Sequence, residues 1–387
     1  MTRVLIAGVS CRAAAESAAR AGFDVTAIDA FGDLDQHASV RALSVPRDFG
    51  VRFTPAAAAR AARSIECDAV VYLSSFENHV TIVRSLVAGR QLWGNSPSVL
   101  RRVRDPFEVT RVLRKRGHAV LSIRVSATRT GRWLLKPVLS GGGRRVRVWQ
   151  PGRRVPRGFY LQEFVEGTPG SIVFVAARGR TVPIGISRQL AGAPAFGATG
   201  FKYCGSILAP AGDAQFARDS ALVHTASALA RTIAEEFELV GVNGLDFVAR
   251  DGVPYAIEVN PRWTASMELV ERAYGLSVFA AHADACVNGA LPASRDFKLG
   301  PARRGVQAFG KAIVFARDDV TVGDAREWVG LGIRDVPHAG DKIAAGRPVC
   351  TVFATGSDAL DCHAALVERA GRVYADLATP GLRARRA

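Results

Sequence analysis

Two carboxylates and one side-chain amide lie close together near residue 260, at the end of a predicted strand. Glu258 and Asn260 are two residues apart, so their side chains leave the same face of that strand. Asp246 lies on the preceding predicted strand, and the Asp-Gly pair between the two strands indicates a hairpin. A three-residue loop, residues 250–252, would place Asp246 on the same face as Glu258. A two-residue turn would place it on the opposite face.

If they share a face, the oxygens of Asp246, Glu258 and Asn260 form a site for Mg²⁺ or Mn²⁺, of the kind that also holds nucleotide phosphates. Arg262 follows and supplies a planar cation for a phosphoryl or carboxylate oxygen. The alternative is an ordinary hairpin with solvated acids on its outer face. The neighbouring apolar residues favour the site, because they imply that one face of the hairpin is buried: Leu245, Phe247, Ile257 and Val259.

A lysine followed closely by three glycines forms a second group. Lys136 lies in a predicted buried strand, where a lysine is costly unless it is paired, as phosphate oxygens would pair it. Gly141, Gly142 and Gly143 follow, and their backbone N–H groups can approach phosphates because no Cβ intervenes. The run is not a Walker loop, since no Gly-Lys-Ser/Thr follows it. A flexible hairpin tip is the ordinary alternative.

In a third group a predicted strand runs into a turn, at residues Gln162, Glu163, Phe164, Val165 and Glu166. The exposed backbone of such a turn can pair with a purine edge, and Phe164 or Val165 can pack on the face of the ring. A plain edge strand explains this segment equally well when it is taken alone.

Composition and patterning predict a globular protein with several domains. The chain has 387 residues, of which 48% are hydrophobic and 22% charged. In residues 1–100, β-branched runs alternate with alanine-rich helical stretches, which predicts a parallel sheet with helical crossovers. Residues 101–295 indicate a mixed α+β domain, and residues 296–387 a small β-rich lobe. The turn after the first strand lacks the G-x-G-x-x-G spacing, so a nicotinamide cofactor is not indicated.

The net charge of +16 suits an anionic partner. Basic residues are spread along the chain, with only Arg144, Arg145 and Arg147 close together, so a nucleic acid is disfavoured against a small anionic substrate. We expect a cytoplasmic protein without membrane association, because no apolar run reaches about 20 residues and the first residues are strand-like. The six cysteines form no C-x-x-C pair, which disfavours zinc. A homodimer is compatible with the sequence.

Taken together and in this order, the three groups resemble the ATP-grasp superfamily over most of the chain. The resemblance implies a Rossmann-like pre-ATP-grasp domain (1–100), an ATP-grasp domain (101–295) and a lobe similar to the C-terminal region of biotin carboxylase (296–387). It implies ATP and Mg²⁺ as cofactors. The implied catalytic residues are Lys136, on the α/β-phosphates, and Arg262, which steadies the transferring group. The other implied roles are phosphate covering by Gly141–Gly143, adenine binding by Gln162–Val165, and metal binding by Asp246, Glu258 and Asn260.

The sequence departs from the superfamily pattern at three places. Pro106 stands where the first ATP lysine is usual, and Arg104 is a candidate substitute. Pro169 stands where many members have a ribose-binding Glu, and Glu166 is a candidate substitute. Ser266 replaces the acid of true biotin carboxylases, which disfavours bicarbonate and biotin chemistry.

Three phrases are similar to those of predicted carboligases related to biotin carboxylase: GTPGS (167–171), FKYCGSILAP (201–210) and IEVNPRWTASMELVERA (257–273). Some such proteins are associated with the biosynthesis of methanofuran or methylofuran and tetrahydromethanopterin. The resemblance therefore implies a carboxylate–amine ligase that works through an acyl phosphate and adds an amino acid such as glutamate to a small-molecule carboxylate.

The amino-terminal sheet would contribute to the substrate pocket through Ser10, Arg12 and residues 75–78, which follow predicted strands. Two alternatives to the ligase remain open. One is an ATP-binding regulatory or scaffold protein without turnover, and the other is a basic nucleic-acid binder.

Overall fold

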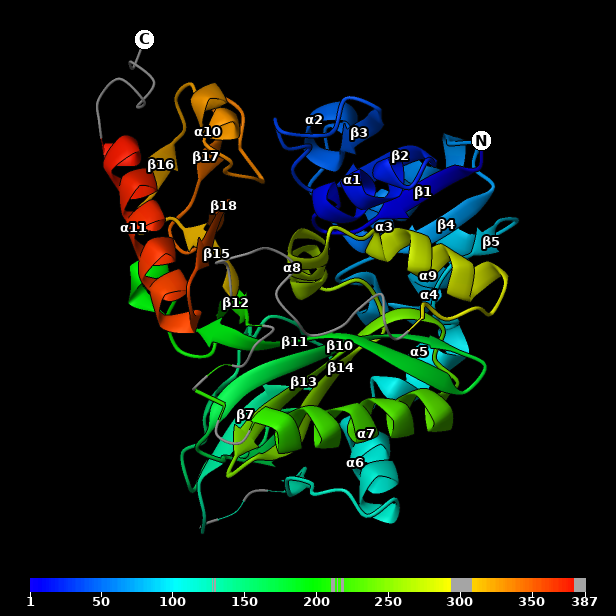
Figure 1. Cartoon of the computed structure of the whole chain (residues 1–387), viewed down its shortest axis with the longest axis vertical. Coiled ribbons are helices and arrows are strands. Elements are labelled where there is room, and N and C mark those ends of the chain that lie inside the picture. The colour runs from blue at the N-terminus through cyan, green and yellow to red at the C-terminus, as the bar shows by residue number, and fades with distance from the viewer. Residues whose placement is uncertain are drawn as a thin grey trace.

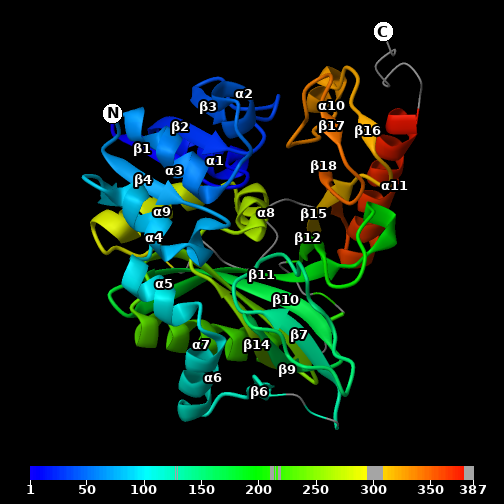
Figure 2. The same cartoon turned by 180° about the vertical axis from the view of Figure 1, so that it is seen from behind.

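The computed structural model describes residues 1–126, 128, 130–209, 213, 215–216, 219–293 and 308–378. The expected boundary between the second and third domains, at residues 295 and 296, lies outside these ranges. Figures 1 and 2 show the amino-terminal domain at one end of the molecule, a large antiparallel sheet across its middle, and the carboxy-terminal elements beside the amino-terminal domain. No described helix is long and apolar enough to span a membrane.

The amino-terminal domain is the predicted parallel sheet, in the order β3-β2-β1-β4-β5. Its buried β-branched strands pack between helices rich in alanine. The strands are β1 (Arg3–Ala7), β2 (Asp24–Asp29), β3 (Val40–Ser44), β4 (Ala69–Tyr72) and β5 (Gln91–Leu92). The helices are α1 (Arg12–Arg20), α2 (Val45–Phe49), α3 (Pro55–Ala61), η1 (Ala62–Ser64), η2 (Phe76–Asn78), α4 (Val80–Val87) and α5 (Pro97–Val103).

A small four-stranded antiparallel sheet, which we call the lid sheet, follows α6 (Pro106–Lys115) and has the order β6-β9-β7-β8. Its strands are β6 (Ile123–Arg124), β7 (Trp133–Pro137), β8 (Arg147–Val148) and β9 (Phe159–Glu163). Figure 2 shows β7 and β9 in front of the large sheet. The glycine run lies between β7 and β8, at the edge of this sheet.

The large sheet has the order β14-β13-β10-β11-β12-β15-β18 and is antiparallel throughout. Its last two strands come from the carboxy-terminal residues that were expected to form a lobe. The strands are β10 (Thr168–Ala177), β11 (Arg180–Ala191), β12 (Tyr203–Leu208), β13 (Gly241–Arg250), β14 (Val253–Asn260), β15 (Ala308–Phe315) and β18 (Pro348–Gly356). The 3₁₀ turn η3 (Pro194–Phe196) lies between β11 and β12.

Helix α7 (Asp219–Phe237) covers one face of the large sheet, because Phe174, Leu245 and Phe247 alternate toward it. Helices α8 (Ala265–Tyr274) and α9 (Val278–Val287) lie on the opposite face, toward the amino-terminal domain (Figure 1). Helix α11 (Ala359–Ala378) packs on β15 and β18. The remaining elements are β16 (Val320–Thr321), α10 (Arg326–Gly330) and β17 (Lys342–Ile343).

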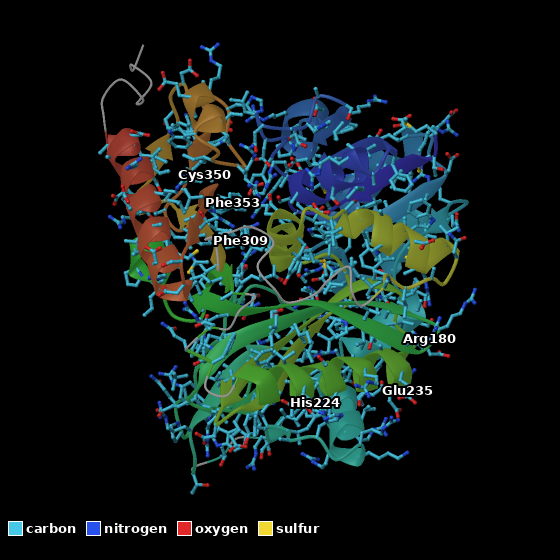
Figure 3. The ribbon with its side chains drawn as sticks, in the orientation of Figure 1. Arg180, His224, Glu235, Phe309, Cys350 and Phe353 are labelled. Atoms are coloured by element: carbon cyan, nitrogen blue, oxygen red, sulfur yellow. The ribbon has the colours of Figure 1, made fainter. Side chains whose placement is uncertain are left out.

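A buried ionic network joins these parts. Arg12, at the start of α1, is fully buried and lies 2.8 Å from both Glu268 of α8 and Asp335. Lys311 of β15 lies 2.6 Å from Glu268. Burial alone would raise the pKa of Glu268, but Arg12 and Lys311 hold it below its usual value. In Figure 3, Phe353 marks the carboxy-terminal side of this junction, and Lys311 lies 5.4 Å from its ring.

We therefore predict that Arg12→Ala is strongly destabilising. The substitution would leave the buried Glu268 and the half-buried Asp335 with less compensation, and removing one partner of a buried ion pair typically costs about 3–5 kcal/mol. The urea midpoint, followed by fluorescence, should fall clearly. Arg60→Ala is the control, since Arg60 is exposed on α3. Equal midpoints for the two variants would show that the network does not stabilise the fold.

Candidate active site

The hairpin between β13 and β14 has the shorter of the two turns that the sequence left open. Arg250 pairs with Val253, so the turn is the two residues Asp251 and Gly252, whose φ values are 54° and 78°. Positive φ at both positions is typical of a type I′ turn. This turn alone would place Asp246 and Glu258 on opposite faces.

A β-bulge restores the common face. Phe247 pairs with Ala256, whereas Asp246 pairs with Glu258, so Ile257 is an extra residue in β14. Directly opposed residues of an antiparallel pair project from the same face. The two carboxylates are thus brought together by the bulge, not by the turn.

Asp246 is half-buried, and its carboxylate lies among polar side chains. Its two oxygens accept hydrogen bonds of 2.9 Å from the side-chain amides of Gln189 and Asn260. Burial, and then the nearby Glu258, raise the pKa of Asp246 to about 6. The Asn260 amide oxygen accepts a 3.2 Å hydrogen bond from Arg262. The three predicted metal ligands therefore form one cluster with Arg262.

The cluster fits a hard divalent cation. It offers two carboxylates and an amide oxygen, the ligands that Mg²⁺ takes together with phosphates. Burial, and then the charge of Glu258, raises the pKa of Asp246, so a bound cation would favour the ionised form of Asp246. Asp246, Glu258 and Asn260 would hold the ion, and nucleotide oxygens would complete its coordination.

Lys136 lies opposite this hairpin, on β7 of the lid sheet. Its Nζ donates to Gln162 Oε1 at 2.9 Å and to the carbonyl oxygen of Ile257, the bulged residue, at 3.1 Å. Burial lowers the pKa of Lys136, while Glu258 and Asp246 oppose that shift. The structure therefore brings Lys136 and Gln162 together beside the acidic pair.

A cleft of about 530 Å³, open to solvent, lies between the lid sheet and β14. Lys136, Gln162 and Glu258 line it, and apolar walls come from Val103, Val109, Val138, Tyr160 and Val259. Polar groups at one end and apolar walls elsewhere suit a nucleotide.

The other residues predicted to bind adenine lie outside this lining. Phe164 packs under the guanidinium of Arg132, at 4.4 Å, and Glu166 pairs with the same arginine. Glu163 accepts a hydrogen bond from the backbone N–H of Ser122.

Arg104 is the central residue that the sequence indicated only weakly. Its Nη1 donates to Glu258 Oε1 at 2.9 Å and to the carbonyl of Val259 at 2.7 Å. Its Nη2 donates to the carbonyl of Ser140 at 2.6 Å and to Asn78 Oδ1 at 3.0 Å. Arg104 therefore connects a metal-ligand candidate, the start of the glycine run and the amino-terminal domain.

The two residues that follow Arg104 begin helix α6. Asp105 caps the helix by accepting hydrogen bonds from the N–H groups of Phe107 and Glu108, and Pro106 occupies the first helical position. Pro106 therefore has a structural role at the start of the helix. Arg104 lines the cleft and adds a positive charge to that of Lys136.

The glycine run folds over the same region. A Cβ at Gly143, where φ is 72°, would collide with the carbonyl of Phe201, so only glycine fits without strain. The Gly142 carbonyl accepts a 3.1 Å hydrogen bond from the N–H of Tyr203. A Cβ at Gly141 would lie 4.0 Å from Arg262 Nη2. The loop is therefore held next to Arg262.

Two residues of the amino-terminal domain contact the arginines of the site, while the expected contribution of residues 75–78 to a substrate pocket stays a prediction. Glu77, which is buried, lies 2.7 Å from Arg262 Nη2, and Asn78 binds Arg104. Arg12, by contrast, lies in the ionic junction. In Figure 3, His224 and Glu235 lie on α7, on the far side of the large sheet, so neither belongs to the site.

Residues 104–266 match the family model described as an ATP-grasp domain. This segment, less than half of the chain, is similar to ATP-grasp domains, and the chain has the ATP-grasp fold.

Solved structures of this fold cover nearly the whole chain. The L-amino acid ligase from Bacillus licheniformis has a TM-score of 0.68 at 16% identity, covering 95% of this chain and 96% of that one. Biotin carboxylase from Campylobacter jejuni has a TM-score of 0.71 at 14% identity, covering 94% and 89%. N5-carboxyaminoimidazole ribonucleotide synthetase from Thermotoga maritima has a TM-score of 0.64 at 17% identity, covering 97% and 98%. At these identities the likeness shows the fold alone.

A curated relative is an uncharacterized protein of Methanocaldococcus jannaschii. It is 27% identical over 122 residues, which are 32% of this chain and 28% of that protein. The match therefore spans less than a third of the relative's length.

We predict that Asp246→Asn stabilises the unliganded protein at neutral pH. Because the folded-state pKa is raised, from 3.8 to about 6, the stability contribution of Asp246 is present below about pH 4. It is lost as the pH rises through 6. Melting curves of the variant should lie above wild type at pH 8 and converge with it near pH 4, with a difference of at most about 3 kcal/mol.

The control for this experiment is Asp251→Asn, in the exposed turn of the same hairpin. It should show no comparable pH dependence. A melting temperature for Asp246→Asn at or below wild type at pH 8 would contradict the proposed crowding of the two carboxylates.

Proposed function

We propose that this chain is an ATP- and Mg²⁺-dependent ligase that joins a carboxylate to an amine through an acyl phosphate. The observation that carries the proposal is the register of the β13–β14 hairpin. The bulge at Ile257 places Asp246 and Glu258 side by side, and Lys136 binds the carbonyl of the same bulged residue. A hairpin with only a structural role would not require the two carboxylates and the lysine to lie together.

The residues of the site suit phosphoryl transfer, which requires charge neutralisation and alignment more than a side-chain nucleophile. Bound Mg²⁺ would neutralise phosphate charge and help to align the transferring group. Lys136 and Arg104 line or border the cleft and provide positive charge. Arg262, held by Glu77 at 2.7 Å, presents its guanidinium next to the glycine run. The run in its closed position excludes water from a reactive acyl group.

The proposed reaction has two steps, one for each substrate. A substrate carboxylate oxygen attacks the γ-phosphorus of ATP, ADP leaves, and an acyl phosphate remains. An amine then attacks the acyl carbon, the amide forms, and phosphate leaves with the loss of the amine proton. The naming of structural neighbours as an L-amino acid ligase and a ribonucleotide synthetase supports carbon–nitrogen bond formation.

Bicarbonate chemistry is not part of this proposal, although biotin carboxylases share the fold. Ser266 lies where those enzymes have an acid, and its hydroxyl is 3.0 Å from that of Thr264 in a buried position. For the substrates we propose an amino acid such as glutamate and a small carboxylate of one-carbon carrier biosynthesis. The support for this pair is the resemblance of the phrases at 167–171, 201–210 and 257–273.

A second candidate is an ATP-binding regulatory or scaffold protein. The observation that favours it is the internal pairing of the site: Glu258 is bound by Arg104, and both oxygens of Asp246 accept amide hydrogens. Release of ADP that depends on both an acid and an amine would separate the ligase from this alternative.

We predict that hydroxylamine traps the acyl group. When the protein is incubated with Mg·ATP, hydroxylamine and a panel of amino acids and small carboxylates, the true carboxylate should yield a hydroxamate and ADP in equal amounts. Colorimetric detection of the hydroxamate and chromatography of the nucleotides measure both. Release of AMP and pyrophosphate would mean adenylation and would overturn the mechanism.

We also predict that Lys136→Ala weakens nucleotide use while the protein stays folded. A hydrogen bond to a charged group contributes about 1.5–3 kcal/mol, or about ten- to 150-fold in Kd or kcat/KM. Calorimetric titration with Mg·ADP measures the change, and melting curves verify folding. Lys115→Ala, at the exposed end of α6, is the control. Unchanged affinity in Lys136→Ala would remove this lysine from the site.

A further inference from the structure

One segment of the chain carries most of its excess positive charge. Between Arg124 and Arg157 the sequence has nine arginines, one lysine and no acidic residue. Its net charge is therefore +10, against +16 for the chain, and all 35 acidic residues lie elsewhere. General enrichment in arginine would not remove every acid from one stretch. The even spread of basic residues expected from the sequence thus conceals a local concentration.

The described residues of this segment include β7 and β8 of the lid sheet, whose two faces differ. Lys136 and Gln162 project from the face toward the cleft. Leu135 and Leu161 pair with each other and project from the opposite, outer face. There they form a small apolar cluster with Trp133 and Trp149, onto which Val155 and Phe159 pack. The chain between β8 and β9 therefore crosses the outer face.

Arginines surround this outer cluster. Arg147 pairs with Leu135 across β7 and β8 and so projects from the same face. The guanidinium of Arg145 lies 4.8 Å from the ring of Phe159, and that of Arg124 lies 4.5 Å from the ring of Trp133. The crossing chain adds three exposed arginines. We call the whole set the arginine face: Arg124, Arg145, Arg147, Arg153, Arg154 and Arg157.

Pairing within the protein does not account for the arginine face. All six arginines are exposed, and none forms an ion pair with a carboxylate in the part of the chain that the structure describes. Arg132, on the same sheet, does pair with Glu166. Elsewhere exposed arginines such as Arg3 and Arg116 bind two acids each. Six unpaired like charges in a small domain repel one another, which favours an anionic partner.

We propose that the arginine face docks an acidic segment of a partner protein. It faces away from the cleft, so a substrate bound there would not reach Lys136. Planar guanidinium groups bind carboxylates with two parallel hydrogen bonds. Proteins that bind single-stranded nucleic acids combine a basic groove with aromatic rings on which bases stack, whereas Trp133 and Trp149 are each only 7% exposed and Arg145 lies over Phe159. The partner is therefore an acidic polypeptide.

The test uses the full chain and a fluorescently labelled oligoglutamate peptide, with binding followed by anisotropy. The triple variant Arg153→Glu, Arg154→Glu and Arg157→Glu should weaken binding by about tenfold or more, because three attractive contacts become repulsive. The control triple makes the same charge change on exposed arginines of the amino-terminal domain: Arg52→Glu, Arg60→Glu and Arg63→Glu. It should alter affinity by less than about threefold, since screening limits distant charges.

Mg·ADP binding should be the same in the lid triple and wild type, because these arginines lie outside the cleft, and the melting temperature should not fall, because the substitutions reduce the repulsion among the arginines. Equal loss of peptide binding in the two triples would overturn the proposal by showing a nonspecific charge effect. Tighter binding of a single-stranded RNA or of phosphatidylserine vesicles than of the peptide, lost in the lid triple, would reassign the face and also overturn it. None of these outcomes depends on the ligase activity.

Discussion

The candidate site depends on one extra residue in a strand. Without the bulge at Ile257, the two-residue turn of the β13–β14 hairpin would point Asp246 and Glu258 to opposite faces. The bulge also directs the carbonyl of Ile257 to Lys136 on the lid sheet. A single local irregularity therefore creates the acidic pair and fixes its position relative to the lysine.

The sequence predicted the parallel amino-terminal sheet, the hairpin and the grouping of Lys136 with the acidic residues. The sheet and the hairpin follow from periodicity and turn residues, which are local, and the grouping follows from the resemblance to the ATP-grasp superfamily. The sequence left the turn length open, because a three-residue loop and a two-residue turn with a bulge both place the two carboxylates on one face. The role of Arg104 depends on Glu258 and Ser140, which are far along the chain. The pairing of β12 with β15 joins segments that are far apart in the sequence, and no local pattern predicts it.

Two arginines of the site are each held by an acid from another element. Arg104, before α6, binds Glu258 on β14, and Arg262, after β14, binds Glu77 in the amino-terminal domain. The carboxylate oxygens of Asp246 instead accept hydrogen bonds from the side-chain amides of Gln189 and Asn260, and burial, followed by the charge of Glu258, raises its pKa. Positive charge brought by a ligand would therefore favour the ionised form of Asp246.

The large sheet crosses the expected boundary between the central domain and the carboxy-terminal residues, since β15 is hydrogen-bonded to β12 and β18 to β15. The carboxy-terminal residues are consequently not a module that can be deleted or exchanged. Truncation before β15 would leave β12 as an open edge with unpaired backbone groups, a template for intermolecular pairing. Loss of activity in a shortened chain would then report aggregation, and chimaeras with related proteins would have to exchange β12 together with β15 and β18.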